Sequence, residues 1–71
     1  MDPEPKVVIG RNIRRHRQRR GWTQEDLSRI TGIHPAEVGR AERGERDLRA
    51  STIVKFANGL EVPSADLMVD L

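Results

Sequence analysis

The segment that decides the fold is TQEDLSRITGIHPAEVGRAERG, residues 23–44. A helix start signal occurs twice around it, eleven residues apart: an apolar residue, a capping residue, then an acid and an apolar residue at the third and fourth helical positions. This order combines a cap for the first backbone N–H groups with an apolar contact across the helix start. Gly32 and Gly44 stand where left-handed stop residues are expected. The segment therefore predicts two short helices joined by a tight turn.

The two predicted helices span residues 23–31 and 35–43. Their start signals are supplied by Trp22, Thr23, Asp26 and Leu27 for the first helix and by Ile33, His34, Glu37 and Val38 for the second. Pro35 stands at the first helical position, where its missing N–H costs nothing. A helix, a short turn with glycine and a second helix form the helix-turn-helix arrangement.

A wider set of residues around this segment forms a recognisable pattern. Its members are Ile9, Gly10, Ile13, Arg14, Arg17, Gly21, Trp22, Thr23, Gln24, Glu25, Leu27, Ser28, Thr31, Gly32, Ile33, Val38, Glu42 and Gly44. The pattern resembles the DNA-binding domain of the lambda repressor, Cro and Xre family, and the resemblance covers residues 7–69. It implies an all-α domain and a sequence-specific regulator of transcription, prokaryotic or from a phage.

Apolar spacing outside this segment predicts three more helices. One spans residues 6–20 and ends before a glycine, and a short one spans residues 64–70. Another begins near Ala50, with Arg49 as a weak cap, and is expected to stop at Gly59. We therefore expect a compact, five-helix, lambda-repressor-like domain.

This domain is expected to occupy residues 6–71. Residues 1–5, with two prolines and two acids, are predicted to form a disordered N-terminal arm.

Composition narrows the function. The 71 residues include no cysteine, and no apolar run approaches the ~20 residues that cross a bilayer. A cytoplasmic protein with no membrane partner is therefore expected. The net charge is only +2, but residues 6–20 hold seven of the 13 Lys and Arg residues and no acid. A basic first helix is compatible with nucleic acid, although arginine-rich helix surfaces are often merely solvated.

Catalysis finds little support in the sequence, and we expect neither an enzyme nor a cofactor. A cysteine nucleophile, a glycine-rich phosphate loop and metal-ligand spacings are all absent from the chain. His16 is interpreted as a half-buried packing residue rather than a metal ligand or catalytic base. His34 is interpreted as a helix cap.

The family resemblance assigns roles on and around the second helix of the pair. Bases would be read by His34, Pro35, Ala36, Glu37 and Arg40, and phosphates would be held by Thr23, Gln24, Arg43, Arg46, Arg49 and Arg14, with Arg11 a weaker candidate. Arg40 is the leading base reader, because arginine can donate twice to the O6 and N7 of guanine. Glu37 could accept from cytosine or complete its own helix cap, and the cap is favoured. Arg17 and Glu42 resemble a partly buried structural ion pair.

Partners follow from the same resemblance. Double-stranded DNA is the expected ligand, and RNA polymerase is a further candidate partner. Because one recognition helix reads too few base pairs for a unique genomic site, a homodimer on a palindromic operator is expected. The apolar C-terminal residues Leu67, Met68, Val69 and Leu71 are assigned to the dimer interface, with Leu67 pointing inward. A frayed hydrophobic end is the competing interpretation. Two alternatives to a self-contained regulator stay open: an antitoxin-like protein-interaction module, and the DNA-binding domain of a longer repressor.

Overall fold

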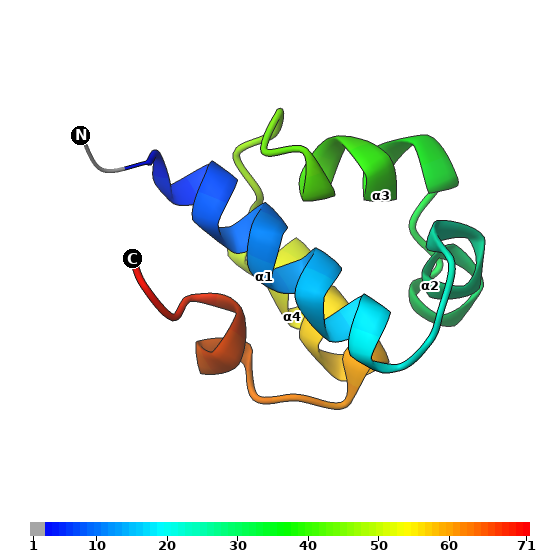
Figure 1. Ribbon diagram of the computed structural model, residues 1–71. Coiled ribbons are helices and arrows are strands. Elements are labelled where there is room, and N and C mark those ends of the chain that lie inside the picture. The colour runs from blue at the N-terminus through cyan, green and yellow to red at the C-terminus, as the bar shows by residue number, and fades with distance from the viewer. Residues whose placement is uncertain (1–2) are drawn as a thin grey trace.

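The structure, a computed structural model, describes residues 3–71 and consists of helices joined by loops (Figure 1). Its elements are α1 (Pro5–Arg19), α2 (Gln24–Thr31), α3 (Pro35–Glu42), α4 (Ala50–Leu60) and the 3-10 helix η1 (Ser64–Leu67). The described residues form no strand, so the prediction of an all-α domain is confirmed. The prediction of five α-helices is wrong, because these residues contain four α-helices and one 3-10 turn.

The predicted helix at residues 64–70 shortens to η1, which ends at Leu67. The carbonyls of Leu67 and Val69 accept hydrogen bonds from the Asn12 amide at 2.9 and 3.0 Å. Asp70 then turns the chain with a φ of +71°. So short a segment gains little from helix propagation, and the side-chain hydrogen bonds from α1 fix a different path.

The predicted stop of α4 at Gly59 is also wrong. The helix continues to Leu60, which is fully buried, and Glu61 ends it in the left-handed conformation with a φ of +58°. A Cβ atom at position 59 would lie 2.7 Å from Cγ2 of Thr31. Gly59 therefore lets α4 pack closely against α2.

The ends of α1 differ slightly from prediction. The helix begins at Pro5, one residue early, and ends at Arg19 before the left-handed Gly21. Of the predicted arm at residues 1–5, residues 1 and 2 lie outside the described residues and Pro5 belongs to the helix.

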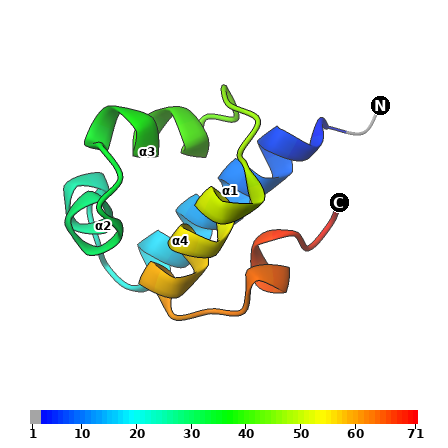
Figure 2. The same ribbon diagram turned by 180° about the vertical axis from the view of Figure 1, so that it is seen from behind.

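One hydrophobic core joins all the elements. It is formed by Ile9, Ile13, Leu27, Val38, Ala41, Ile53, Phe56, Ala57, Leu60 and Leu67. At the crossing of α1 and α3, a Cβ on Gly10 would lie 2.2 Å from the Ala41 carbonyl oxygen, so glycine is required there. The two views place α3 and η1 on opposite sides of α1 (Figures 1 and 2). The surface of α3 and the C-terminal segment therefore belong to different faces of the domain.

Candidate nucleic-acid interface

The start of α2 is fixed by a reciprocal cap, as predicted. The Asp26 backbone N–H donates to Thr23 Oγ1 at 3.0 Å, and the Thr23 N–H donates to Asp26 Oδ2 at 2.9 Å. The hydrogen bond from the Thr23 backbone lowers the pKa of Asp26. Beyond the helix, Gly32 adopts a φ of +76° and the Ser28 hydroxyl donates to the Ile33 carbonyl at 2.5 Å. These bonds hold the turn that sets the orientation of α3.

The first turn of α3 presents a small exposed surface. His34 caps the helix as predicted, because its Nδ1 accepts from the Ala36 N–H at 3.1 Å. His34, Pro35 and Ala36 are exposed, whereas Val38 is fully buried. The helix is thus anchored through one face and open to a partner on the other.

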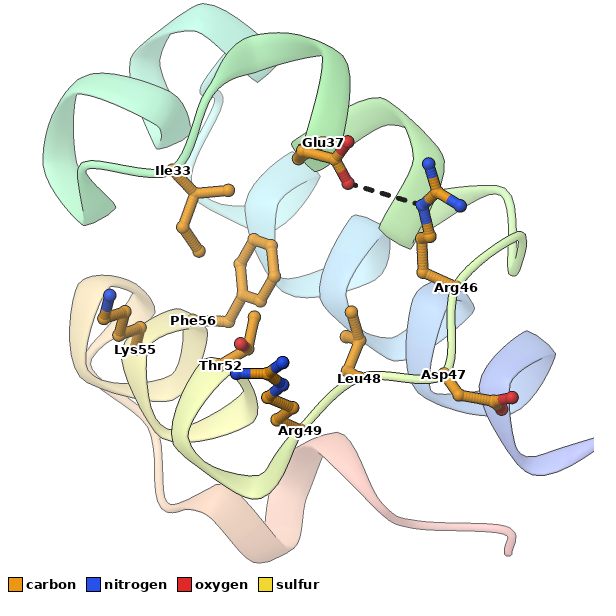
Figure 3. A pocket seen from close by; sticks show the side chains of 9 residues that line it. All are labelled: Ile33, Glu37, Arg46, Asp47, Leu48, Arg49, Thr52, Lys55 and Phe56. Carbon is orange, nitrogen blue, oxygen red and sulfur yellow. Dashed lines mark ion pairs between the residues drawn. The ribbon is translucent and has the colours of Figure 1, made fainter.

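Glu37 does not complete the cap, so the interpretation favoured from the sequence is wrong. Its carboxylate accepts from Arg40 Nη1 at 2.6 Å and lies 3.5 Å from Arg46 Nε (Figure 3). These two guanidinium groups lower the pKa of Glu37, the hydrogen bond from Arg40 being the largest cause. Two full positive charges attract the carboxylate more strongly than one backbone N–H.

The loop between α3 and α4 is rich in exposed cations. Arg43 Nε binds Glu45 Oε2 at 2.5 Å, and Arg46 reaches back to α3. Arg49 is the N-cap residue of α4, and its side chain makes no cap hydrogen bond with the described residues. This agrees with the prediction of a weak cap. With Lys55, which the sequence did not single out, Arg46 and Arg49 border a hollow of about 470 Å³ over Phe56 (Figure 3). Lys55 was missed because the sequence analysis assigned no surface role to residues of α4.

Arg17 and Glu42 form a bidentate ion pair between α1 and α3. Arg17 Nε and Nη2 donate to the two carboxylate oxygens at 2.6 and 2.9 Å, and Nη1 donates to the Trp22 carbonyl at 2.7 Å. Only 11% of the Arg17 side chain and 2% of the Glu42 side chain are exposed. The hydrogen bond to Glu42 raises the pKa of Arg17.

Gln24, a predicted phosphate ligand, lies beside this pair. Its amide Nε2 donates to Glu42 Oε1 at 3.2 Å. Gln24, Arg14 and Arg43 border a second hollow of about 260 Å³ around the ion pair. The structure therefore brings together three of the predicted phosphate ligands, from α1, α2 and the end of α3.

The C-terminal residues divide between the core and the surface. Leu67 is fully buried, so its assignment to the dimer interface is wrong, although its inward direction was expected. Met68, Val69 and Leu71 are 38%, 42% and 62% exposed. Asn12, only 2% exposed, holds this segment through the two carbonyls named above. The sequence analysis missed Asn12, since a lone asparagine on a helix carries no signal of its partners.

Other sites receive no support among the described residues. His16 is half-buried, as expected of a packing residue. Within residues 3–71, no cluster of His, Cys, Asp and Glu side chains could hold a metal ion. The same residues contain no helix long and apolar enough to span a membrane.

Comparison with known proteins identifies the family. Residues 13–67 match the helix-turn-helix family HTH_3. The chain belongs to this helix-turn-helix family of Xre and lambda-repressor type. Among the relatives of this chain, the control protein C.SmaI of Serratia marcescens is 32% identical to it over 89% of this chain and 75% of its own length. The transcriptional regulator SutR of Escherichia coli is 36% identical over 78% of this chain but only 31% of its own length.

Solved structures agree with the assignment. The restriction-modification controller C.AhdI of Aeromonas hydrophila superposes with a TM-score of 0.84 and 32% identity, covering 87% of this chain and 94% of its own. The hypothetical transcription factor NHTF of Neisseria superposes with a TM-score of 0.89 and is 32% identical. The match covers 93% of this chain and 76% of NHTF. C.Esp1396I, solved as a tetramer on its natural 35-base-pair operator, shares the fold with a TM-score of 0.84 and 24% sequence identity. The match covers 93% of this chain and 87% of C.Esp1396I.

Proposed function

We propose that the helix-turn-helix protein is a sequence-specific, double-stranded DNA-binding regulator of transcription that places α3 in the major groove. The observation that carries this proposal is the exposed first turn of α3, followed one turn later by Arg40, with exposed arginines on α1 and in the loop after α3. An α-helix fits the major groove, side chains on it read base edges, and flanking cations hold phosphates. Such a regulator works where the chromosome lies, so the proposal includes a cytoplasmic location.

The roles of the side chains follow from their places. His34, Pro35, Ala36 and Arg40 face the bases from α3; Thr23, Gln24, Arg14, Arg43, Arg46 and Arg49 hold phosphates around them, and Lys55 joins this set. Arg40 carries most of the sequence preference, because one guanidinium can donate to both O6 and N7 of guanine. The phosphate set supplies affinity for any duplex and makes binding dependent on salt.

We further propose that the protein binds as a two-fold dimer through Met68, Val69 and Leu71. One recognition helix reads only a few base pairs, and a dimer doubles this by reading two half-sites about one helical turn apart. The C-terminal segment that carries these exposed residues lies across α1 from α3, so a partner there leaves both recognition helices free (Figure 2). C.Esp1396I, a protein of the same fold, was solved as a tetramer on operator DNA.

Selection of bound duplexes from a random pool, followed by footprinting, tests the proposal. We expect enrichment of a site with two-fold symmetry and protection of both half-sites. A pool that stays random after several rounds would contradict sequence-specific binding.

The dimer has its own test. Sedimentation at micromolar concentration should show a dimer with operator DNA, and the double variant Met68→Asp, Leu71→Asp should lose it and bind the palindromic site more weakly. Both side chains are exposed, so the variant should fold. A monomer in every condition, or undiminished binding by the double variant, would exclude this interface.

The same DNA-binding role is compatible with a longer protein. The matched region spans three-quarters of C.SmaI but less than a third of SutR. Relatives of this family thus include proteins in which such a domain is one part of a larger regulator.

A further inference from the structure

We propose that Glu37 is a specificity-determining residue that acts by positioning Arg40 and by restraining Arg46. This inference rests on the proposed function, since it concerns how α3 distinguishes the preferred site from other DNA. It differs from a cap or a direct contact with cytosine, the roles that the sequence suggested for Glu37.

The first step is the geometry of Arg40. Its Nη1 donates to Glu37 Oε1 at 2.6 Å, across one turn of α3. A guanidinium has five N–H donors in a planar fork, so this bond leaves another edge of the fork free. Glu37 thereby fixes the plane of the guanidinium while the free edge can still donate to two acceptors on a guanine.

The second step is the link to the loop. The other oxygen of Glu37 lies 3.5 Å from Arg46 Nε, so one carboxylate joins the base reader on α3 to a phosphate ligand between α3 and α4 (Figure 3). The Glu37, Arg40 and Arg46 side chains are 44%, 41% and 53% exposed. Ion pairs this exposed contribute little to folding, so a role in stability does not explain the arrangement.

The third step is the charge of the ligand. A phosphate on an arbitrary duplex must compete with Glu37 for Arg46 and approach the carboxylate's negative charge, which disfavours the complex. A guanine at the preferred position can use the free edge of Arg40 without displacing Glu37. The competition for Arg46 and the charge of the carboxylate weaken binding to every duplex, whereas the oriented Arg40 strengthens binding only to the preferred site. Glu37 should therefore increase discrimination.

The variant Glu37→Gln tests this, with Glu45→Gln as its matched control. Both remove one exposed carboxylate that binds an arginine, but Glu45 binds Arg43 and leaves Arg40 untouched. The measurement is the Kd on the selected site and on random DNA of equal length, at fixed salt. We expect both variants to bind random DNA more tightly, and Glu37→Gln alone to lower the ratio of specific to random affinity, by about five- to tenfold from loss of one oriented arginine contact. An equal fall with Glu45→Gln would reduce the effect to bulk charge and overturn the inference.

A second background separates positioning from direct reading. In an Arg40→Ala protein, Glu37→Gln should cause no further fall in the ratio, because the group that Glu37 orients is gone. A persisting fall would mean that Glu37 reads a base itself, and a melting temperature lowered as far as that of a variant of the buried Glu42 would mean that it is structural; either result overturns the inference. A wild-type protein that fails to discriminate at all would instead overturn the proposed function. Discrimination by the wild type that Glu37→Gln leaves intact would overturn only the role of Glu37.

Discussion

Glu37 and Glu42 stand on the same helix, and each accepts a hydrogen bond of 2.6 Å from an arginine. Their surroundings differ: the Glu42 side chain is 2% exposed and its partner Arg17 11%, whereas Glu37 is 44% exposed and Arg40 41%. A buried pair that loses one partner leaves an uncompensated charge, while an exposed pair exchanges readily with water. The same chemical pair thus joins α3 to α1 where it is buried and lies open to solvent at the other end of the helix.

The largest expected effect comes from breaking the buried pair. Glu42→Ala leaves Arg17 buried without its carboxylate and should cost on the order of 3–5 kcal/mol of unfolding free energy. In a domain of this size that is enough to lower the melting temperature by more than about 10 °C. Thermal and denaturant unfolding measure this, with Glu45→Ala as the exposed control. A Glu42→Ala protein as stable as the control would show that the pair does not hold α1 to α3.

The next largest loss of stability is expected from removing the buried, uncharged side chain of Asn12. Asn12→Ala removes the amide that donates to the carbonyls of Leu67 and Val69 and should cost about 1–3 kcal/mol, the penalty for leaving the buried Leu67 carbonyl unpaired. The same variant should weaken dimerisation, because Val69 belongs to the segment that Asn12 holds. Denaturant unfolding and sedimentation check the two effects, and full stability with an intact dimer would assign Asn12 no role at the C-terminus.

At the exposed end of α3 the expected loss is in binding and not in folding. Arg40→Ala should lose about 1–3 kcal/mol on the preferred site and little on random DNA. Its melting temperature should match that of the wild type, in contrast to Glu42→Ala. Titration of both duplexes gives the answer, and equal losses on the two would show that Arg40 holds a phosphate.

Changes in the loop should be smaller and indifferent to sequence. Arg43→Ala and Arg46→Ala should each weaken all duplexes similarly and lower the slope of log affinity against log salt by about one unit. Binding measured over a range of salt concentrations tests this. An unchanged slope in both variants would remove the loop from the interface.

The smallest expected effect is the change in folding stability at low pH. Arg40 lowers the pKa of Glu37 and Arg43 lowers that of Glu45, so both pairs contribute their stability above the ordinary carboxylate pKa of about 4.3 and lose it as the pH falls through the lowered values. The stability difference between the wild type and a Glu37→Gln, Glu45→Gln double variant should therefore be small at pH 7 and vanish in stronger acid. Melting curves between pH 7 and pH 3 measure it, and a difference that grows in acid would contradict the sign.

The sequence by itself determined the local signals of this protein and much of its function. The caps at Thr23 and His34, the left-handed Gly32 and the buried faces of the helices depend on residues close in the chain, whose spacing is visible in the sequence. The ion pair of Arg17 and Glu42, 25 residues apart, was accessible only through the family resemblance.

Tertiary structure alone decided the contacts between segments that are separated along the chain. The loop after α3 brings a second guanidinium, that of Arg46, to Glu37, and Gly59 serves close packing because α2 lies against it. The C-terminal segment lies against α1 because the Asn12 amide donates to the carbonyls of Leu67 and Val69. Each outcome depends on atoms that are distant in sequence and adjacent in space, and spacing along the chain carries no information about that distance.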